Sequence, residues 1–259
     1  MRMMKKVLGT VTVLALSVSL LAGCGSTAAS PVSSAASTAA ENTTSSVVSE
    51  TTSAAADENE AAAAQLLNDL TGSYQELWPV ILADEYKQTW LDDCTALVGE
   101  DNAEAAFEKL SSMVTGDVYG EDAVKAYANG GGAYFCGFTN SLATLTFDGE
   151  TSTISGTDKD GNVLFSHTYH YIGMEPVRGL YEFESDDADS GEFTYFFLAP
   201  DTSAETYHIE FRYGSDAEAL SQYDAGEYAY WVASGISTDC DQTMIDNCIE
   251  LFCTENLAG

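Results

Sequence analysis

A change of hydrophobic period near residue 140 constrains the fold of this chain more than any other feature. From Ala143 onward apolar and polar residues alternate, which is the period of a strand with one buried face. Strand-like runs end at Gly, Pro or Asp clusters and cover residues 143–147, 151–157, 163–172, 180–184, 192–198 and 206–213. No helical pattern separates these runs. We therefore expect an antiparallel meander, closed or nearly closed as a barrel, over about residues 134–213.

Helical patterns flank this region on both sides. Before it, apolar residues recur at helical spacing in residues 61–70, 85–97 and 103–114, with shorter segments at 74–83 and 122–128. After it, residues 215–223 and 239–255 have helical patterns, and the second has Cys248 on its apolar face. The expected fold is mainly β with α. A small N-terminal helical part covers about residues 58–130, and C-terminal helices cover about residues 215–256.

The first 57 residues predict where the protein works. Arg2, Lys5 and Lys6 precede an apolar run over residues 7–22, the pattern of a secretory signal too short to span a membrane comfortably. The run ends in Leu-Ala-Gly-Cys, which is similar to a bacterial lipobox, so we expect cleavage after residue 23 and a lipid on Cys24. Residues 24–57 are a tether rich in Ser, Thr and Ala. We expect a lipid-anchored protein on the extracytoplasmic face of the cell membrane.

The charge of the chain argues against two classes of partner. Loss of the signal peptide removes 3 of the 9 basic residues and none of the 41 acidic ones, so 6 face 41 and the formal charge is −35. We therefore expect no nucleic-acid partner and no electrostatic docking onto anionic lipid. Such acidity is typical of a solvated, self-repelling surface, and a weak general attraction for cations is the alternative.

Few residues fit a catalytic site. The chain has three histidines, no Gly-x-Ser-x-Gly and no His-Glu-x-x-His, so we expect a protein that is not an enzyme.

Five cysteines remain after Cys24, none of them in a Cys-x-x-Cys motif, and the odd number leaves at least one free or paired between chains. We expect them to be buried apolar residues. The alternative is a bridge from Cys94 or Cys136 to the C-terminal helix in an oxidising compartment.

Four stretches of the chain resemble a known family. They are residues 70–79 (LTGSYQELWP), residues 165–173 with Tyr-His-Tyr-Ile-Gly, residues 178–184 (RGLYEFE) and residues 193–214 with Ala-Pro inside. Their order and spacing are similar to those of the ZinT (YodA) proteins, which bind zinc and cadmium in the periplasm. The resemblance covers about residues 66–235. It implies a calycin-like, lipocalin-type barrel with a zinc site of three histidines near the barrel mouth.

This chain departs from the three-histidine pattern that the resemblance implies. The first histidine position falls on Phe196. The family's His-x-His pair falls on His208 and Glu210, or on Thr206 and His208 if residues are counted forward from Pro200. A histidine and a carboxylate two residues apart on a strand share one face and are acceptable zinc ligands. The alternative is a partly exposed strand whose polar residues face solvent.

If His208 and Glu210 bind a metal, a third ligand must come from a neighbouring strand or from His167 or His170. These residues are three apart in a strand and face opposite sides, so at most one can join a shared site. We expect a lipid-anchored protein that binds zinc or another divalent transition metal, for capture or for hand-over to a metal-uptake transporter. The alternative is a metal-free calycin-like barrel that binds a small apolar or peptide ligand, or a surface interaction module.

Overall fold

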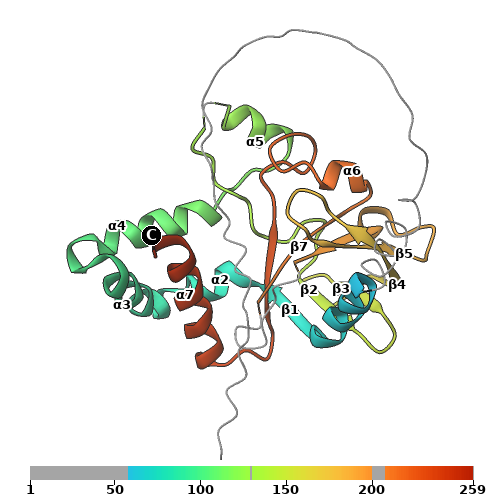
Figure 1. Cartoon of the computed structure of the whole chain (residues 1–259), viewed down its shortest axis with the longest axis horizontal. Helices are drawn as coiled ribbons and strands as arrows, with labels where there is room; N and C mark the ends of the chain where they lie inside the picture. Colours follow the sequence, from blue (N-terminus) through green and yellow to red (C-terminus); the bar gives the residue numbers. More distant parts are fainter. Residues whose placement is uncertain (1–57, 129, 200–207, 259) are drawn as a thin grey trace, which may run out of the picture. The chain divides into compact units, whose positions relative to one another are not determined.

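The computed structural model describes residues 58–128, 130–199 and 208–258 (Figure 1). The signal peptide, Cys24 and the tether lie outside the described residues, as do Pro200 and Thr206. Within the described ranges, no helix has both the length and the apolar character needed to cross a membrane.

Eight strands form a closed antiparallel barrel in which each strand pairs with its neighbours in sequence and β8 pairs with β1. The strands are β1 (Gly72–Glu76), β2 (Thr144–Asp148), β3 (Thr153–Thr157), β4 (Val163–Met174), β5 (Tyr181–Ser185), β6 (Tyr195–Leu198), β7 (His208–Gly214) and β8 (Ala233–Ser237). This up-and-down order of eight strands is that of lipocalin-type barrels. The predicted fold class is confirmed.

Two strands lie outside the segment predicted to form the barrel. Residues 134–213 supply β2 to β7, whereas β1 comes from the part expected to be helical and β8 from the part expected to hold only C-terminal helices. Six strands alone would leave two unpaired edges, and β1 and β8 remove them by pairing with β2, β7 and each other. Of the segment 74–83, which has a helical pattern, only α2 (Leu77–Ile81) is an α-helix.

Helices pack against the barrel in two places. The helical segment 58–69 places Ala63, Leu66 and Leu67 in the barrel core. It lies so close to the β2–β3 turn that a Cβ on Gly149 would come within 2.4 Å of the Asn68 Cα. On another side, α3 (Lys87–Val98) and α4 (Glu100–Val114) pack against each other and against the C-terminal α7 (Gln242–Leu257). The remaining short helices are η1 (Asp84–Tyr86), α5 (Glu121–Ala126), η2 (Gly191–Phe193) and α6 (Ala217–Leu220).

Aromatic side chains fill the interior of the barrel. The rings of Phe165 and Phe193 stack with centroids 3.9 Å apart, and Phe196 stacks on Tyr213 at 5.4 Å. Trp231 meets the Tyr213 ring edge to face at 4.9 Å. These rings belong to one continuous buried cluster that also contains apolar residues of the helical segment 58–69. The barrel interior is therefore a packed core.

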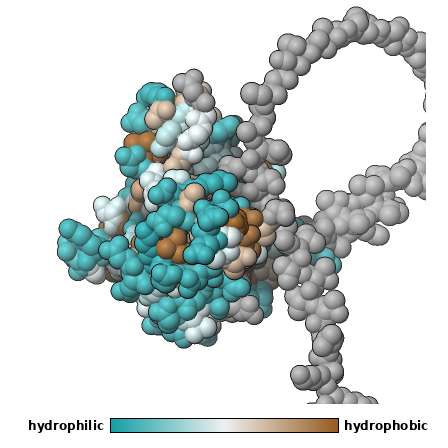
Figure 2. All heavy atoms as spheres, turned by 90° about the vertical axis from the view of Figure 1, so that its left-hand side faces the viewer, coloured by the Kyte–Doolittle hydropathy of each residue, from teal (hydrophilic) through white to brown (hydrophobic). Residues whose placement is uncertain are grey.

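A second apolar cluster lies outside the barrel, between β8 and the helices. Ile236 of β8 joins it from the barrel wall, and Trp90 of α3 is fully buried in it. The Trp90 indole donates a hydrogen bond to the Ile81 carbonyl at 2.7 Å, and its ring packs edge to face on Phe252 of α7. Figure 2 shows that the outer face on this side of the molecule is mostly hydrophilic, with small separate apolar patches. The helices thus turn their apolar faces inward.

Candidate metal site

The residues of β7 alternate between the inside and the outside of the barrel. Ile209, Phe211 and Tyr213 belong to the interior core, and each has at most 1% of its surface exposed. His208 and Glu210 therefore point out of the barrel, where they are partly buried. The two side chains share one face of the strand, and that face is the outer one.

A small cavity lies beside this outer face of β7. Its volume is about 30 Å³, which is enough for one water molecule or one ion. Side chains of β7, α2 and α7 line it: His208, Glu210, Leu77, Trp78, Ile81, Cys248, Leu251, Phe252 and Glu255. The cavity thus combines an apolar wall with a few polar groups from a strand and a helix.

Four of the lining residues carry groups that bind transition metals. His208 offers an imidazole nitrogen, Glu210 and Glu255 offer carboxylate oxygens, and Cys248 offers a sulfur. Burial raises the pKa of the Cys248 thiol to about 12, so at neutral pH its sulfur keeps its proton unless a metal displaces it.

These donors do not form a ready-made metal centre. In the described part of the chain, no three His, Cys, Asp or Glu side chains are grouped so that they could hold an ion. An ion bound by His208 and Glu210 would therefore have to draw Glu255 or Cys248 of α7 toward the strand. The donor types fit a divalent metal, while their positions require a side-chain movement on the helix.

The two other histidines lie on β4 and face opposite sides of it. His167 points inward, where its ring stacks at 5.9 Å on the buried Phe165, and its Nδ1 lies 2.7 Å from an Asp187 carboxylate oxygen. His170 points outward and is half exposed. The expectation that at most one of them could join a shared site agrees with this orientation.

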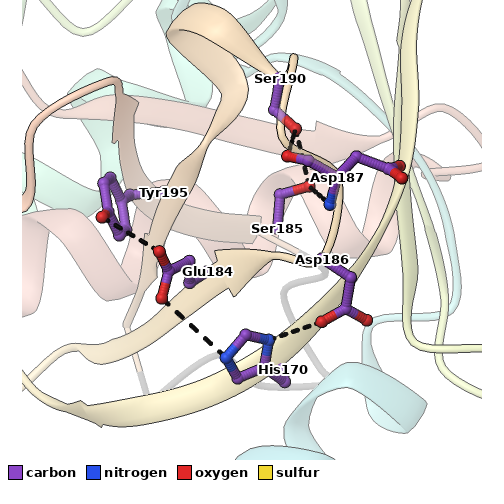
Figure 3. A network of polar contacts seen from close by, with 7 residues as sticks. All are labelled: His170, Glu184, Ser185, Asp186, Asp187, Ser190 and Tyr195. Carbon is purple, nitrogen blue, oxygen red and sulfur yellow. Dashed lines mark hydrogen bonds and ion pairs between the residues drawn. The ribbon is translucent and has the colours of Figure 1, made fainter.

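Acidic side chains lie on both sides of the His170 ring on the outer face of β4 and β5. Its Nδ1 lies 2.8 Å from an Asp186 oxygen, and its Nε2 lies 4.0 Å from Glu184 (Figure 3). The Tyr195 hydroxyl donates to the other oxygen of Glu184 at 3.2 Å. All these side chains are at the surface, where such ion pairs contribute little to stability.

The structure does not bring the β4 histidines to the β7 pair. β5 and β6 lie between β4 and β7 in the barrel wall. No group of three metal-binding side chains joins them within the described residues. A third ligand for His208 and Glu210 is therefore better sought on α7, which shares their cavity.

The position that the ZinT resemblance assigns to a first histidine is an interior position in this chain. Phe196 is fully buried, and its ring stacks on those of Phe211 and Tyr213. A phenyl ring cannot coordinate a metal. His208 and Glu210 lie on the other side of the barrel wall from Phe196. The barrel interior therefore does not fit a three-histidine zinc site.

The helical pattern of residues 239–255 predicts that Cys248 faces inward, but it does not point to Glu255. Glu255 lies near the end of α7, and it reaches the cavity only because that helix packs beside β7. One acidic residue among 41 carries no signal of its own. The packing of α7 alone identifies it.

Replacing Phe196 by histidine tests whether the barrel interior can hold a metal. We expect Phe196→His to lower the free energy of unfolding by roughly 2–4 kcal/mol, because it leaves a cavity and buries a polar ring among aromatic neighbours. Zinc should stabilise the variant no more than it stabilises the wild type, as measured by urea unfolding with and without the metal. Phe196→Leu is the matched control without a donor. A zinc-dependent gain specific to Phe196→His would contradict this account.

No protein-family model matches the sequence, and no curated protein matches it. Among solved structures, the Zn(II)-bound ZinT-like domain of Streptococcus pneumoniae AdcA is 16% identical with a TM-score of 0.45, and the match covers 71% of this chain and 89% of that one. Zn(II)-bound AdcA from Streptococcus pneumoniae is 16% identical with a TM-score of 0.41, and the match covers 72% of this chain and 35% of that one. The chain thus spans about a third of that protein. A likeness at this level says nothing about what this chain binds.

Proposed function

We propose that this chain is a lipid-anchored extracytoplasmic protein that binds a divalent transition metal, zinc in the first instance, on the outer face of its barrel. Its role is binding, for capture or for hand-over to a metal-uptake transporter, and not catalysis. The observation that carries the proposal is the cavity between β7 and α7, whose lining includes an imidazole, two carboxylates and a thiol.

The position of the cavity supports a site that exchanges its metal. His208 and Glu210 are partly buried on a strand whose inner face packs in the core. Glu255 is exposed near the end of α7, so its long side chain has room to move toward the strand. An open site with three protein ligands leaves a position for water or for a partner's ligand. Carboxylates in place of imidazoles relax selectivity toward other divalent ions.

The acidity of the mature chain supports the same proposal. With 41 acidic residues in the sequence, the surface attracts divalent cations in general and raises their local concentration. Specific binding still requires the nitrogen and sulfur donors beside β7. The negative charge of the surface thus attracts divalent cations in general, and the donor atoms of the cavity bind one of them specifically.

Calorimetric titration of residues 25–259 with zinc, without chelators or a histidine tag, tests the metal site. We expect saturable one-to-one binding near neutral pH. His208→Ala and Glu210→Ala should each weaken it roughly 100-fold or more, since merely disturbing groups behind a ligand costs about 10–100-fold. Glu255→Gln should weaken it as well. His170→Ala is the matched control, because it removes an imidazole far from the cavity, and its affinity should equal that of the wild type.

Two outcomes of this titration would contradict the metal proposal. Tight binding that survives both β7 substitutions would place the metal elsewhere. The absence of saturable zinc binding in the wild type would contradict the proposal that the protein binds a metal.

The anchor is tested by Cys24→Ala in the full chain. We expect the substitution to abolish labelling with a radioactive or clickable fatty acid and to leave an unprocessed or released protein, because the thiol is the site of acylation. Cys240→Ala is the control, since Cys240 is only partly buried and is therefore an accessible thiol. Lipid labelling that persists in Cys24→Ala would overturn the anchoring proposal.

A groove outside the barrel favours a second candidate function. Its volume is about 330 Å³, within the range of small-ligand sites. It is lined by the end of β1, by α2 and the residue after it, and by residues 114–116 and 135–137: Glu76, Trp78, Pro79, Leu82, Val114, Thr115, Gly116, Phe135, Cys136 and Gly137. If no metal binds, a small apolar or peptide ligand would occupy this groove, since aromatic side chains fill the barrel interior.

A further inference from the structure

Two cysteine sulfurs meet where α3 packs on α7. The Sγ atoms of Cys94 and Cys253 are 3.9 Å apart, and both side chains are fully buried. From this geometry we propose that Cys94 and Cys253 form a disulfide in the exported protein, which cross-links the C-terminal helix to α3. The sulfurs must approach from 3.9 Å to about 2.0 Å, a shift that small rotations of two facing side chains can supply.

The helix packing around the pair is well defined. Trp90 lies one turn before Cys94 on α3, and its ring packs edge to face on Phe252 of α7 at 6.0 Å. Phe252 is the residue next to Cys253. The same contact that seats Trp90 on α7 therefore sets Cys94 opposite Cys253. The way the two helices pack thus places Cys94 and Cys253 together, inside the apolar cluster that the helices share.

Acidic side chains of α3 and α7 lie close together at the edge of the contact between the two helices. Burial raises the pKa of Asp93 on α3, and the nearby carboxylates of Glu250 and Asp246 on α7 raise it further. A carboxyl whose pKa is raised by folding contributes stability only at low pH and loses it as the pH rises through that pKa. Near neutral pH the acidic residues therefore push α3 and α7 apart. A covalent bond between the helices would oppose that repulsion.

A buried cysteine elsewhere in the fold provides a comparison. The Cys136 thiol lies 3.8 Å from the Tyr134 carbonyl oxygen and also contacts the side chains of Ser234 and Trp78. Five cysteines are free in the described residues, and one bridge would leave three of them reduced. The odd number noted in the sequence is compatible with a single internal disulfide.

The cross-link forms by exchange with an external disulfide, such as oxidised glutathione or the disulfide of a thiol oxidase. One protein thiolate attacks that disulfide and releases one thiol of the oxidant. The second protein thiolate then attacks the mixed disulfide and releases the other. Two protein thiols and one external disulfide thus give one protein disulfide and two external thiols.

The reaction must precede the docking of α7. Burial raises the pKa of Cys94, and burial together with the neighbouring Cys94 raises that of Cys253, so thiolate is scarce once the helices have packed. We therefore expect oxidation during folding and slow oxidation of a protein that has folded in reduced form. Adding oxidised glutathione either during refolding or only after refolding separates these two cases.

The test uses the full chain exported in a bacterial host, with free thiols alkylated in denaturant before extraction. Mass spectrometry of a non-reducing digest should find the peptides of Cys94 and Cys253 joined to each other. The oxidised protein should lose on the order of 10 °C of Tm on reduction, because the bond closes a loop of roughly 160 residues. Cys94→Ala and Cys253→Ala should have no reductant-dependent Tm, and the double variant should match the single ones.

Cys136→Ala is the matched control, because it removes another buried thiol and should keep the reductant-dependent shift. Alkylation of both Cys94 and Cys253 in the exported wild type would overturn the proposal. A disulfide that joins either cysteine to another partner, or one confined to the remaining cysteines, would overturn it as well. Because the digest uses wild-type protein, the test holds even if a variant fails to fold.

Discussion

The packing of aromatic rings inside the barrel is the constraint on which the rest of the structure depends. Phe196, Phe211 and Tyr213 stack on one another and fix the inner faces of β6 and β7. Because each strand alternates its side chains, placing these rings inside forces His208 and Glu210 outside. A barrel that fills its interior with its own side chains has to bind ligands on its surface, in the spaces between wall and helices.

The C-terminal helix α7 supplies two of the metal-binding groups beside the outer surface of the barrel. It packs on α3 through its apolar face and brings Glu255 and Cys248 to the cavity beside β7. The same helix carries Cys253, whose proposed bond to Cys94 would hold it in place. The disulfide and the metal site are independent proposals, yet both depend on where α7 docks. A disulfide of this kind requires an oxidising compartment.

The sequence predicted the parts of the fold with strong local patterns. Alternating residues identified the segments of β2 to β7, but Tyr74 of β1 lies in a segment with a helical pattern. The strand β8 (ASGIS) has Ile236 as its one β-branched residue and no aromatic residue. Both β1 and β8 form because they pair with each other and close the barrel, which is a long-range constraint that local sequence patterns do not carry. The shared face of His208 and Glu210 followed from strand geometry. The approach of Glu255 did not, because it depends on the docking of a helix distant in sequence.

Anomalous diffraction at the zinc edge, from crystals of residues 25–259 grown with equimolar zinc, would locate a bound metal. We expect one strong peak outside the barrel, within coordination distance of His208 and Glu210 and of a side chain from α7, with the rings around Phe196 unmoved. A peak inside the barrel, or beside His170 with none at β7, would contradict this expectation.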